Sequence, residues 1–240
     1  DDHDEAFYRE WVRALFEGFY DAVLWLIQLA PWFVVALVLG LVAWRLVGRG
    51  FGVFAALGLA ACWLMGLWPE TTSTFALVLS ATFLALVLAI PIGVLAGFLP
   101  KLDRVVEPVL DLIQTMPPYI YLLPAIALLG FGPATALAAT LIVAMPPAIR
   151  LTSLGLRQTP VHFVELGQAT GMTPAQMFFK IRLPFALPSI MAGINQSLMM
   201  AFGMVVIAGI VGSGGLGQSI YESIRTLDIG KSIDAAIAIV

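Results

Sequence analysis

Charged side chains are scarce in this sequence: Lys, Arg, Asp and Glu make up 11% of its 240 residues, whereas 60% are hydrophobic. Ordinary water-soluble domains carry about 25% charged residues, so the composition excludes such a domain. The net charge of −3 provides no basic surface, which argues against nucleic acid as a partner. Cysteine occurs once, as Cys62 within an apolar run, so an internal disulfide is excluded and a packing role is expected.

Motifs for catalysis and for nucleotide binding are also missing. No stretch matches G-x-x-x-x-G-K-S/T, so the chain lacks a Walker-type loop for ATP phosphates. The energy for any work that the chain performs must therefore come from a partner or from an ion gradient. His3 and His162 lie far apart in sequence, which argues against a metal pair, and no serine forms a nucleophile elbow near His162. We therefore expect neither an enzyme nor a metal site.

Long apolar runs recur along the chain, separated by short polar breaks. This pattern favours a multi-pass helical bundle, because a helix satisfies its own backbone hydrogen bonds in lipid. Spans are expected at residues 31–44, 51–68, 75–98, 134–149 and 185–211, with a charged turn at 101–104. A further segment, 104–129, is broken at Met116-Pro117-Pro118. Broken helices occur at membrane depth only against protein or a water-filled cavity, so this segment is a candidate wall of a pathway.

The two ends of the chain depart from this pattern. Residues 1–30 mix charges with apolar residues at helical spacing, which predicts an amphipathic helix at the membrane surface or, equally, a solvated helix packed on the bundle. The sequence does not begin with Met and shows no signal peptide, so a trimmed N-terminus is expected. The last apolar run, 233–240, is too short to cross about 30 Å of hydrocarbon, so we expect the rest of a final helix to be missing.

Residues 165–184 interrupt the apolar sequence with a segment typical of two short helices. Gly171 is suited to the left-handed backbone that ends the first, and Thr173 and Pro174 suit the N-cap and first position of the second. Pro184 is expected to end this elbow and to set the start of the next span. We call residues 161–184 the elbow.

The distribution of positive charge gives an orientation. With the elbow in the cytoplasm, eight of the 12 Lys and Arg residues fall on that side, as the positive-inside rule requires. These eight are Arg45, Arg49, Lys101, Arg104, Arg150, Arg157, Lys180 and Arg182. The N-terminus and the glycine-rich residues 212–217 then face outward.

The glycine-rich run matches G-x-G-x-x-G through Gly212, Gly214 and Gly217, with Gly215 between them. A dinucleotide site would need a preceding strand and a βαβ unit, which a membrane helix does not supply. We therefore predict a flexible turn or an outer gate element.

The elbow resembles the cytoplasmic loop of ABC importer permeases, in which this helix docks onto the ATPase subunit. The family spacing is a Glu, a Gly six residues later, an Ile ten beyond that, and Leu-Pro two beyond the Ile. It occurs here as Glu165, Gly171, Ile181, Leu183 and Pro184. The two alanines usual after the glutamate are replaced by Leu166 and Gly167. The resemblance implies that these residues couple the chain to an ATPase, with Phe163 and Leu166 on the apolar side of the contact; an exposed helix carboxylate is the alternative for Glu165.

From about residue 74 onward the sequence also resembles the permeases of glycine betaine, proline betaine and choline importers. The segments that carry this resemblance are 114–117 (QTMP), 121–124 (YLLP), 187–196 (LPSIMAGINQ) and 214–217 (GGLG). It implies an all-α, polytopic bundle with a five-helix type I ABC importer core at 71–240, including a coupling loop at 151–184. Two additional transmembrane helices at 31–70 and the amphipathic segment at 1–30 precede that core.

The same resemblance implies the partners of the chain in a bacterial cytoplasmic (inner) membrane. They are a second copy of the permease, an ABC ATPase that holds ATP and Mg, a solute-binding protein and membrane lipid, with no cofactor in this chain itself. The expected solute is glycine betaine, proline betaine or choline, with trimethylamine oxide and carnitine left open. Two other classes also stay open, a secondary transporter driven by an ion gradient and a membrane scaffold or sensor subunit.

Polar side chains at membrane depth are costly unless they are paired or face water. Candidate path residues are therefore Gln114, Tyr119, Tyr121, Asn195 and Gln196. For Asn195 and Gln196, interhelical hydrogen bonding is as strongly favoured as lining the path. The tyrosines are expected to pack near the path, since the aromatic cage of the resembled family belongs to the binding protein. A secondary transporter should carry paired membrane carboxylates or inverted repeats, and Glu107 and Asp111 are the only nearby carboxylate pair.

Overall fold

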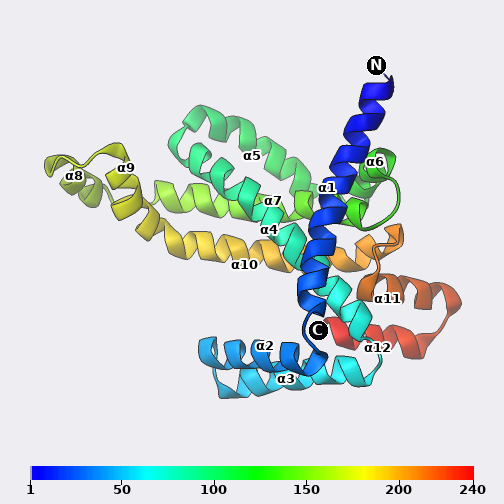
Figure 1. Cartoon of the computed structure of the whole chain (residues 1–240). Coiled ribbons are helices and arrows are strands. Elements are labelled where there is room, and N and C mark those ends of the chain that lie inside the picture. The colour runs from blue at the N-terminus through cyan, green and yellow to red at the C-terminus, as the bar shows by residue number, and fades with distance from the viewer. Residues whose placement is uncertain (1) are drawn as a thin grey trace. The chain divides into compact units, whose positions relative to one another are not determined.

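The computed structural model describes residues 2–240, with side chains from Glu5 onward, so Asp1 and the side chain of His3 lie outside the described part. All regular elements over these residues are helices, which confirms the all-α class (Figure 1). The α-helices are α1 (Asp2–Gln28), α2 (Trp32–Leu46), α3 (Arg49–Leu64), α4 (Trp68–Phe98), α5 (Pro100–Thr115), α6 (Tyr119–Leu129), α7 (Pro133–Arg157), α8 (Val161–Ala169), α9 (Pro174–Met177), α10 (Leu183–Ala208), α11 (Gly215–Thr226) and α12 (Ile229–Ile239). A π-helix, η1 (Phe178–Arg182), joins α9 to α10, and a 3-10 turn, η2 (Gly209–Val211), follows α10.

These helices form two compact units. The first contains the chain up to Ser80, Pro118–Thr140 and Phe202–Val240, and the second contains Ala81–Pro117 and Leu141–Ala201. Helices α4, α7 and α10 each contribute residues to both units. They are also the helices long and apolar enough to cross a membrane as single elements, with Pro174–Val211 counted as one continuous span around α10.

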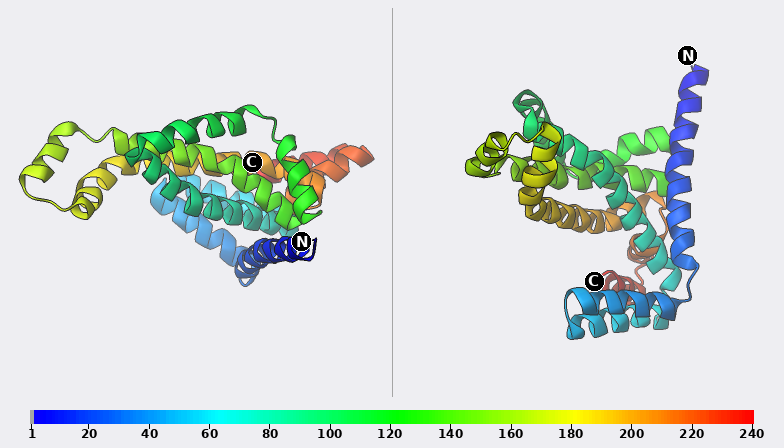
Figure 2. Two further views of the ribbon diagram at one scale, coloured as in Figure 1. Left: turned by 90° about the horizontal axis from the view of Figure 1, so that it is seen from above. Right: turned by 60° about the vertical axis from the view of Figure 1, so that its left-hand side comes forward.

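In the first unit, α2 and α3 form a hairpin of two short helices lying side by side (Figure 2). Glycine permits this approach, because a Cβ on Gly52 would lie 2.7 Å from the carbonyl oxygen of Gly40. The Trp32 and Trp63 rings stack across the hairpin at 4.4 Å. With 15 and 16 residues, each helix is about 23 Å long, less than the roughly 30 Å of a hydrocarbon core. That each crosses the membrane therefore stays a prediction.

A small apolar core of the first unit holds α11 and α12 against the loop before α4. Its buried members are Leu67, Leu216, Ile220 and Ala235. The hydroxyl of Thr74 on α4 accepts the backbone N–H of Leu216 at 2.9 Å, which satisfies a free donor at the start of α11. Cys62 is buried, with Sγ 3.8 Å from the carbonyl oxygen of Ala238, so the expected packing role is confirmed.

In the second unit, α7 lies between α4 and α10 because small residues let the backbones meet. A Cβ on Gly93 of α4 would fall 2.7 Å from the Cβ of Thr152, and one on Gly193 of α10 would fall 3.2 Å from the Cα of Ala148. Close approach at small residues is the usual way in which membrane helices associate. Helix α5 packs on the same unit through Leu110, which is buried with Ala89, Ala148 and Ile149.

Several sequence expectations need correction at element boundaries. The charged residues 101–104 form the first turn of α5 instead of a loop, since Pro100 supplies a good first helical residue. The span expected to end near Arg150 continues to Arg157, and the helix expected to end at Trp68 ends at Leu64. The break at residues 116–118 is confirmed: α5 ends at Thr115 and α6 begins at Tyr119.

Candidate coupling elbow, glycine turn and helix-pairing residues

The elbow begins with α8, which ends in a Schellman motif. Gly171 has φ +71°, and its N–H donates to the carbonyl oxygen of Gln168 at 3.1 Å. The N–H of Met172 donates to the carbonyl oxygen of Gly167 at 3.0 Å. These two bonds satisfy carbonyls in the last turn of α8. The left-handed backbone at Gly171 favours glycine at this position. The prediction that Gly171 ends the first helix is confirmed.

The second helix of the elbow begins with a capping box. The N–H of Gln176 donates to Thr173 Oγ1 at 3.3 Å, and the N–H of Thr173 donates to Gln176 Oε1 at 3.0 Å. Pro174 occupies the first helical position, where its missing N–H costs nothing. The turn between the two helices therefore has fixed geometry at both of its ends.

Packing of α8 against the start of α10 orients the elbow in its unit. The Phe163 and Phe185 rings lie 4.7 Å apart, and Ile181 is buried. Gly167 lies so close to Met177 that a Cβ would fall 2.6 Å from the Met177 methyl. An alanine here therefore fits only if the Met177 side chain moves. Glu165 and Leu166 are both exposed, Leu166 to 56%.

Pro184 does not end the elbow, contrary to the sequence prediction. It lies at the second position of α10, and the helix from Pro174 through η1 into α10 is continuous. Proline has no N–H to donate to the carbonyl four residues earlier, and its ring clashes with that carbonyl in a regular α-helix. The turn before Pro184 is widened into a π-helix, with the Leu183 N–H bonded to the Phe178 carbonyl oxygen. Figure 1 shows α8 and α9 beyond the ends of α7 and α10.

The glycine-rich turn is shorter than the sequence motif. Gly212, Gly214 and Gly215 have φ of +70°, +73° and +84°, so the backbone here requires glycine. Gly217 belongs instead to α11, where a Cβ would lie 2.1 Å from the carbonyl oxygen of Val205. The turn thus ends at Gly215, and Gly217 serves helix packing. A gate function for this turn stays a prediction.

The candidate path residues are divided between the two units. Gln114 is exposed at the end of α5, and Asn195 and Gln196 are exposed on α10, all in the second unit. Tyr119 and Tyr121 begin α6 in the first unit. These two groups therefore do not form one site within either unit, and their role in a path stays a prediction.

Of the polar trio on α10, the serine makes the interhelical hydrogen bond. Asn195 Nδ2 contacts only Met199 Sδ, at 3.9 Å, among the contacts described for it. Ser197 is buried, and its hydroxyl donates to the carbonyl oxygen of Ala144 on α7 at 2.6 Å. The hydrogen bond between helices that was predicted for Asn195 or Gln196 is thus made by Ser197 instead.

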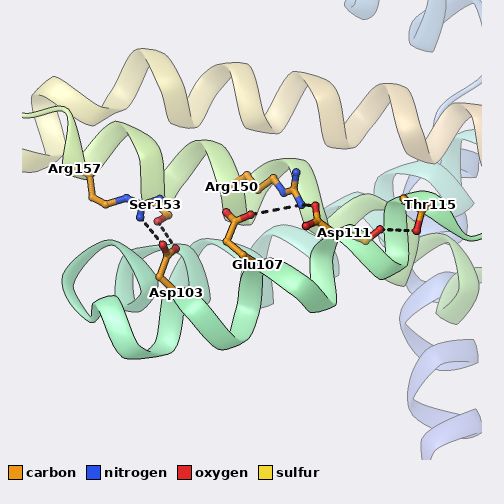
Figure 3. Close-up of polar contacts among 7 residues, drawn as sticks. All are labelled: Asp103, Glu107, Asp111, Thr115, Arg150, Ser153 and Arg157. Carbon is orange, nitrogen blue, oxygen red and sulfur yellow. Dashed lines mark hydrogen bonds and ion pairs between the residues drawn. The ribbon is translucent and has the colours of Figure 1, made fainter.

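The structure reveals a set of ion pairs between α5 and α7 that the sequence analysis missed (Figure 3). Arg150 pairs with Asp111 through Nη2, and the same nitrogen lies 3.7 Å from Glu107 Oε2. Arg157 pairs with Asp103, whose other oxygen accepts the Ser153 hydroxyl at 3.4 Å. We call these six residues the α5–α7 ladder: Asp103, Glu107, Asp111, Arg150, Ser153 and Arg157.

The pattern that predicts the ladder is present in the sequence. Asp103, Glu107 and Asp111 recur every four residues, which places three carboxylates on one face of α5. Arg150 and Arg157 are seven residues apart, so both arginines lie on one face of α7. Two such faces of opposite charge on nearby apolar helices favour pairing. The ladder also accounts for Glu107 and Asp111, since the carboxylate pair that a secondary transporter would use is engaged by an arginine.

Comparison with known proteins identifies the family of the chain. Residues 89–240 match the family described as binding-protein-dependent transport system inner membrane component. The chain belongs to this family. It is therefore a multi-pass transport permease of the bacterial inner membrane, of the ABC importer class, and not a catalytic subunit.

Curated relatives cover most of the chain. The chain is 38% identical over 242 residues to the glycine betaine transport system permease protein OpuAB of Bacillus subtilis, a match that covers 96% of this chain and 86% of that protein. It is 40% identical over 227 residues to the glycine betaine/carnitine transport permease protein GbuB of Listeria monocytogenes, covering 93% and 80%. The glycine betaine/proline betaine permease ProW of Escherichia coli is 41% identical over 207 residues, 58% of its length.

A solved structure supports the fold. The chain resembles the inward-facing MetNI methionine ABC transporter with a TM-score of 0.63 and 26% identity. The match covers 73% of this chain and 87% of that one. The predicted class, an all-α transmembrane bundle with an ABC importer permease core, is thus confirmed.

Proposed function

We propose that this chain is the permease subunit of an ATP-driven importer for a compatible solute such as glycine betaine, proline betaine or choline. The observation that carries the proposal is its 38% identity to a glycine betaine permease over 96% of the chain. Permeases named for trimethylamine N-oxide are related at 34% and 37%, and one named for choline at 34% over 161 residues. Betaines are favoured because the permeases named for glycine betaine match with higher identity, 38%, 41% and 40%.

The elbow is proposed to dock onto a cytoplasmic ATPase, which would hold ATP and Mg. Its two caps fix the angle between α8 and α9, and its outer face leaves Glu165 and Leu166 accessible. An exposed leucine beside a carboxylate on a short, fixed helix suits a helix-in-groove contact. Phe163 and Ile181 face inward, so their part in coupling is to hold α8 on α10. The backbone of the elbow depends on Gly171 after α8, and on Leu183 and Pro184 at the start of α10.

The remaining partners follow from this assignment. A solute-binding protein delivers the solute on the side opposite the elbow, and a second copy of the permease completes the membrane part. An ion-gradient mechanism is disfavoured, because Arg150 engages both Glu107 and Asp111 and leaves this pair without a free carboxylate to carry the coupling ion.

The test is ATPase activity and solute uptake in proteoliposomes that contain the chain and its candidate ATPase, with and without a binding protein loaded with glycine betaine. Stimulation of both activities by the loaded binding protein is the expected result. Uptake that follows a sodium or proton gradient and needs no ATPase would contradict the proposal. Binding proteins loaded with choline, carnitine or trimethylamine oxide, tested in parallel, identify the solute.

A further inference from the structure

We infer that the α5–α7 ladder is a mechanical link that makes α5 follow the elbow end of α7 during transport. This inference rests on the proposed function. The ladder residues are positioning residues, because they are proposed to act through the helices that they join and not on the solute. Their charges fix how α5 is placed along α7.

The two outer pairs of the ladder lock the register of the helices. Asp103 and Asp111 are eight residues apart on α5, about 12 Å along its axis, and Arg150 and Arg157 are about 10.5 Å apart on α7. The pairs run in antiparallel order, with Asp103 on Arg157 and Asp111 on Arg150 (Figure 3). A slide of α5 by one helical turn would move both outer carboxylates away from their partners, and Glu107 could take the place of only one of them.

The surroundings make broken pairs costly. Only 16% of the Asp103 side chain and 31% of the Arg150 side chain are exposed, and Arg150 Nε is buried with no hydrogen-bond partner among the described residues. Leu110, the residue before Asp111, is buried in a cluster with Ala148 of α7. Removing Arg157 or Asp111 therefore leaves Asp103 or Arg150 as a mostly buried charge without its pair, which costs more than an exposed ion pair is worth.

The ends of the ladder lie at the two places that such a link would connect. Arg157 is the last residue of α7, and only residues 158–160 separate it from α8 of the elbow. Those three residues are held close to α7, since the Gln158 N–H donates to Leu154 and the Thr159 hydroxyl to Leu156, both at 3.0 Å. At the other end, Asp111 lies one turn before Thr115, after which the chain breaks at residues 116–118. A displacement of the elbow thus reaches the broken segment through Arg157, Asp103 and α5.

The first test is a charge exchange in the complete transporter. Arg157→Asp and Asp103→Arg each leave two like charges facing, and we expect the solute moved per ATP hydrolysed to fall about tenfold in each. The exchanged variant with both substitutions restores the pair and should recover most of that ratio. Arg104→Asp is the matched control, because Arg104 is the exposed neighbour of Asp103 on α5 and lies outside the ladder.

The ratio of uptake to ATPase activity separates a link from a merely structural role. A link predicts ATPase stimulation that persists while uptake fails. Single variants with the wild-type ratio would overturn the inference, as would an exchanged variant no better than either single one. Wild-type protein without ATP-driven uptake would overturn the proposed function and this inference together, whereas active wild type with unaffected variants overturns this inference alone.

A second test asks whether the ladder stays closed during the cycle. Cysteines at positions 103 and 157, in a chain with Cys62→Ala, are bridged by a short thiol crosslinker. The unbridged variant lacks the Asp103–Arg157 pair and should take up little solute. We expect bridging to raise its uptake, because a covalent tie replaces the link between helices that move together. No gain of uptake on bridging, or a fall that is reversed by cleaving the crosslinker, would overturn the inference.

Discussion

At the scale of single residues, the packing of the chain depends on glycines where two backbone segments are in direct contact. A Cβ on Gly209 would lie 2.3 Å from the backbone carbonyl of Gly217, and one on Gly217 would lie 2.1 Å from the carbonyl oxygen of Val205. Neither contact involves a side chain that could turn away. Both glycines are therefore needed for their size, whereas Gly212 and Gly214 are needed for their backbone conformation.

Gly217→Val should therefore destabilise the protein strongly. Overpacking of this kind costs about 1–3 kcal/mol, and a clash with rigid backbone favours the upper end. Gly203→Ala is the control: Gly203 is also helical, but a Cβ there meets nothing within 4 Å, so a gain of up to about 1 kcal/mol is expected. Thermal unfolding of the purified protein in detergent, followed by circular dichroism, measures both. Equal midpoints for Gly217→Val and wild type would contradict the assignment.

At the scale of the element, the elbow depends on one residue with positive φ. A Cβ on Gly171 would meet nothing within 4 Å, so a substitution there acts only through the backbone. A β-branched residue at φ +71° costs about 1–2 kcal/mol, whereas Asn visits this region readily. The helix end, and with it the angle between α8 and α9, should therefore be lost in Gly171→Val and kept in Gly171→Asn.

The consequence is a loss of coupling without a loss of insertion. We expect Gly171→Val to reduce ATP-driven uptake by up to about tenfold, and Gly171→Asn to keep most of it. Gly171→Pro should be the most damaging, because proline cannot adopt φ +71° and removes the N–H that bonds to Gln168. Uptake and membrane content are measured on the same vesicles. Wild-type uptake by the proline variant would rule out this role for the elbow.

Local chemistry made some of these elements predictable from sequence. Gly171, Thr173 and the paired prolines at 117 and 118 act through their own backbone, so their effects can be read without knowing the fold. The α5–α7 ladder could not be derived in the same way, because Asp103 and Arg157 meet only after two helices pack. The full length of α7 was likewise decided by packing, since the residues around Arg150 also suit an earlier helix end.

At the scale of the whole molecule, α10 relates the elbow to the glycine turn. The helix has 26 residues and is about 39 Å long, enough to cross a hydrocarbon core of about 30 Å. Nothing breaks it, since Pro188 lies inside a continuous helix. The elbow, just before α10, and the chain that follows Gly212 should therefore lie on opposite sides of the membrane. The charge count agrees with this orientation, although Arg150 and Arg157 belong to α7 and pair with α5 instead of lying in a loop.

Thiol labelling tests this orientation directly. Cys62 is buried and is replaced by alanine, and single cysteines are placed at the exposed positions Glu165 in the elbow and Lys231 in α12. A membrane-impermeant maleimide should label Lys231→Cys in intact spheroplasts and Glu165→Cys only in inside-out vesicles, because one continuous helix separates the two regions and α11, at about 18 Å, is too short to return the chain. Labelling of both positions from one side would mean that α10 does not cross the membrane. The elbow would then lie on the same side as the glycine turn, and ATP-driven movement at one could no longer be transmitted across the bilayer to the other.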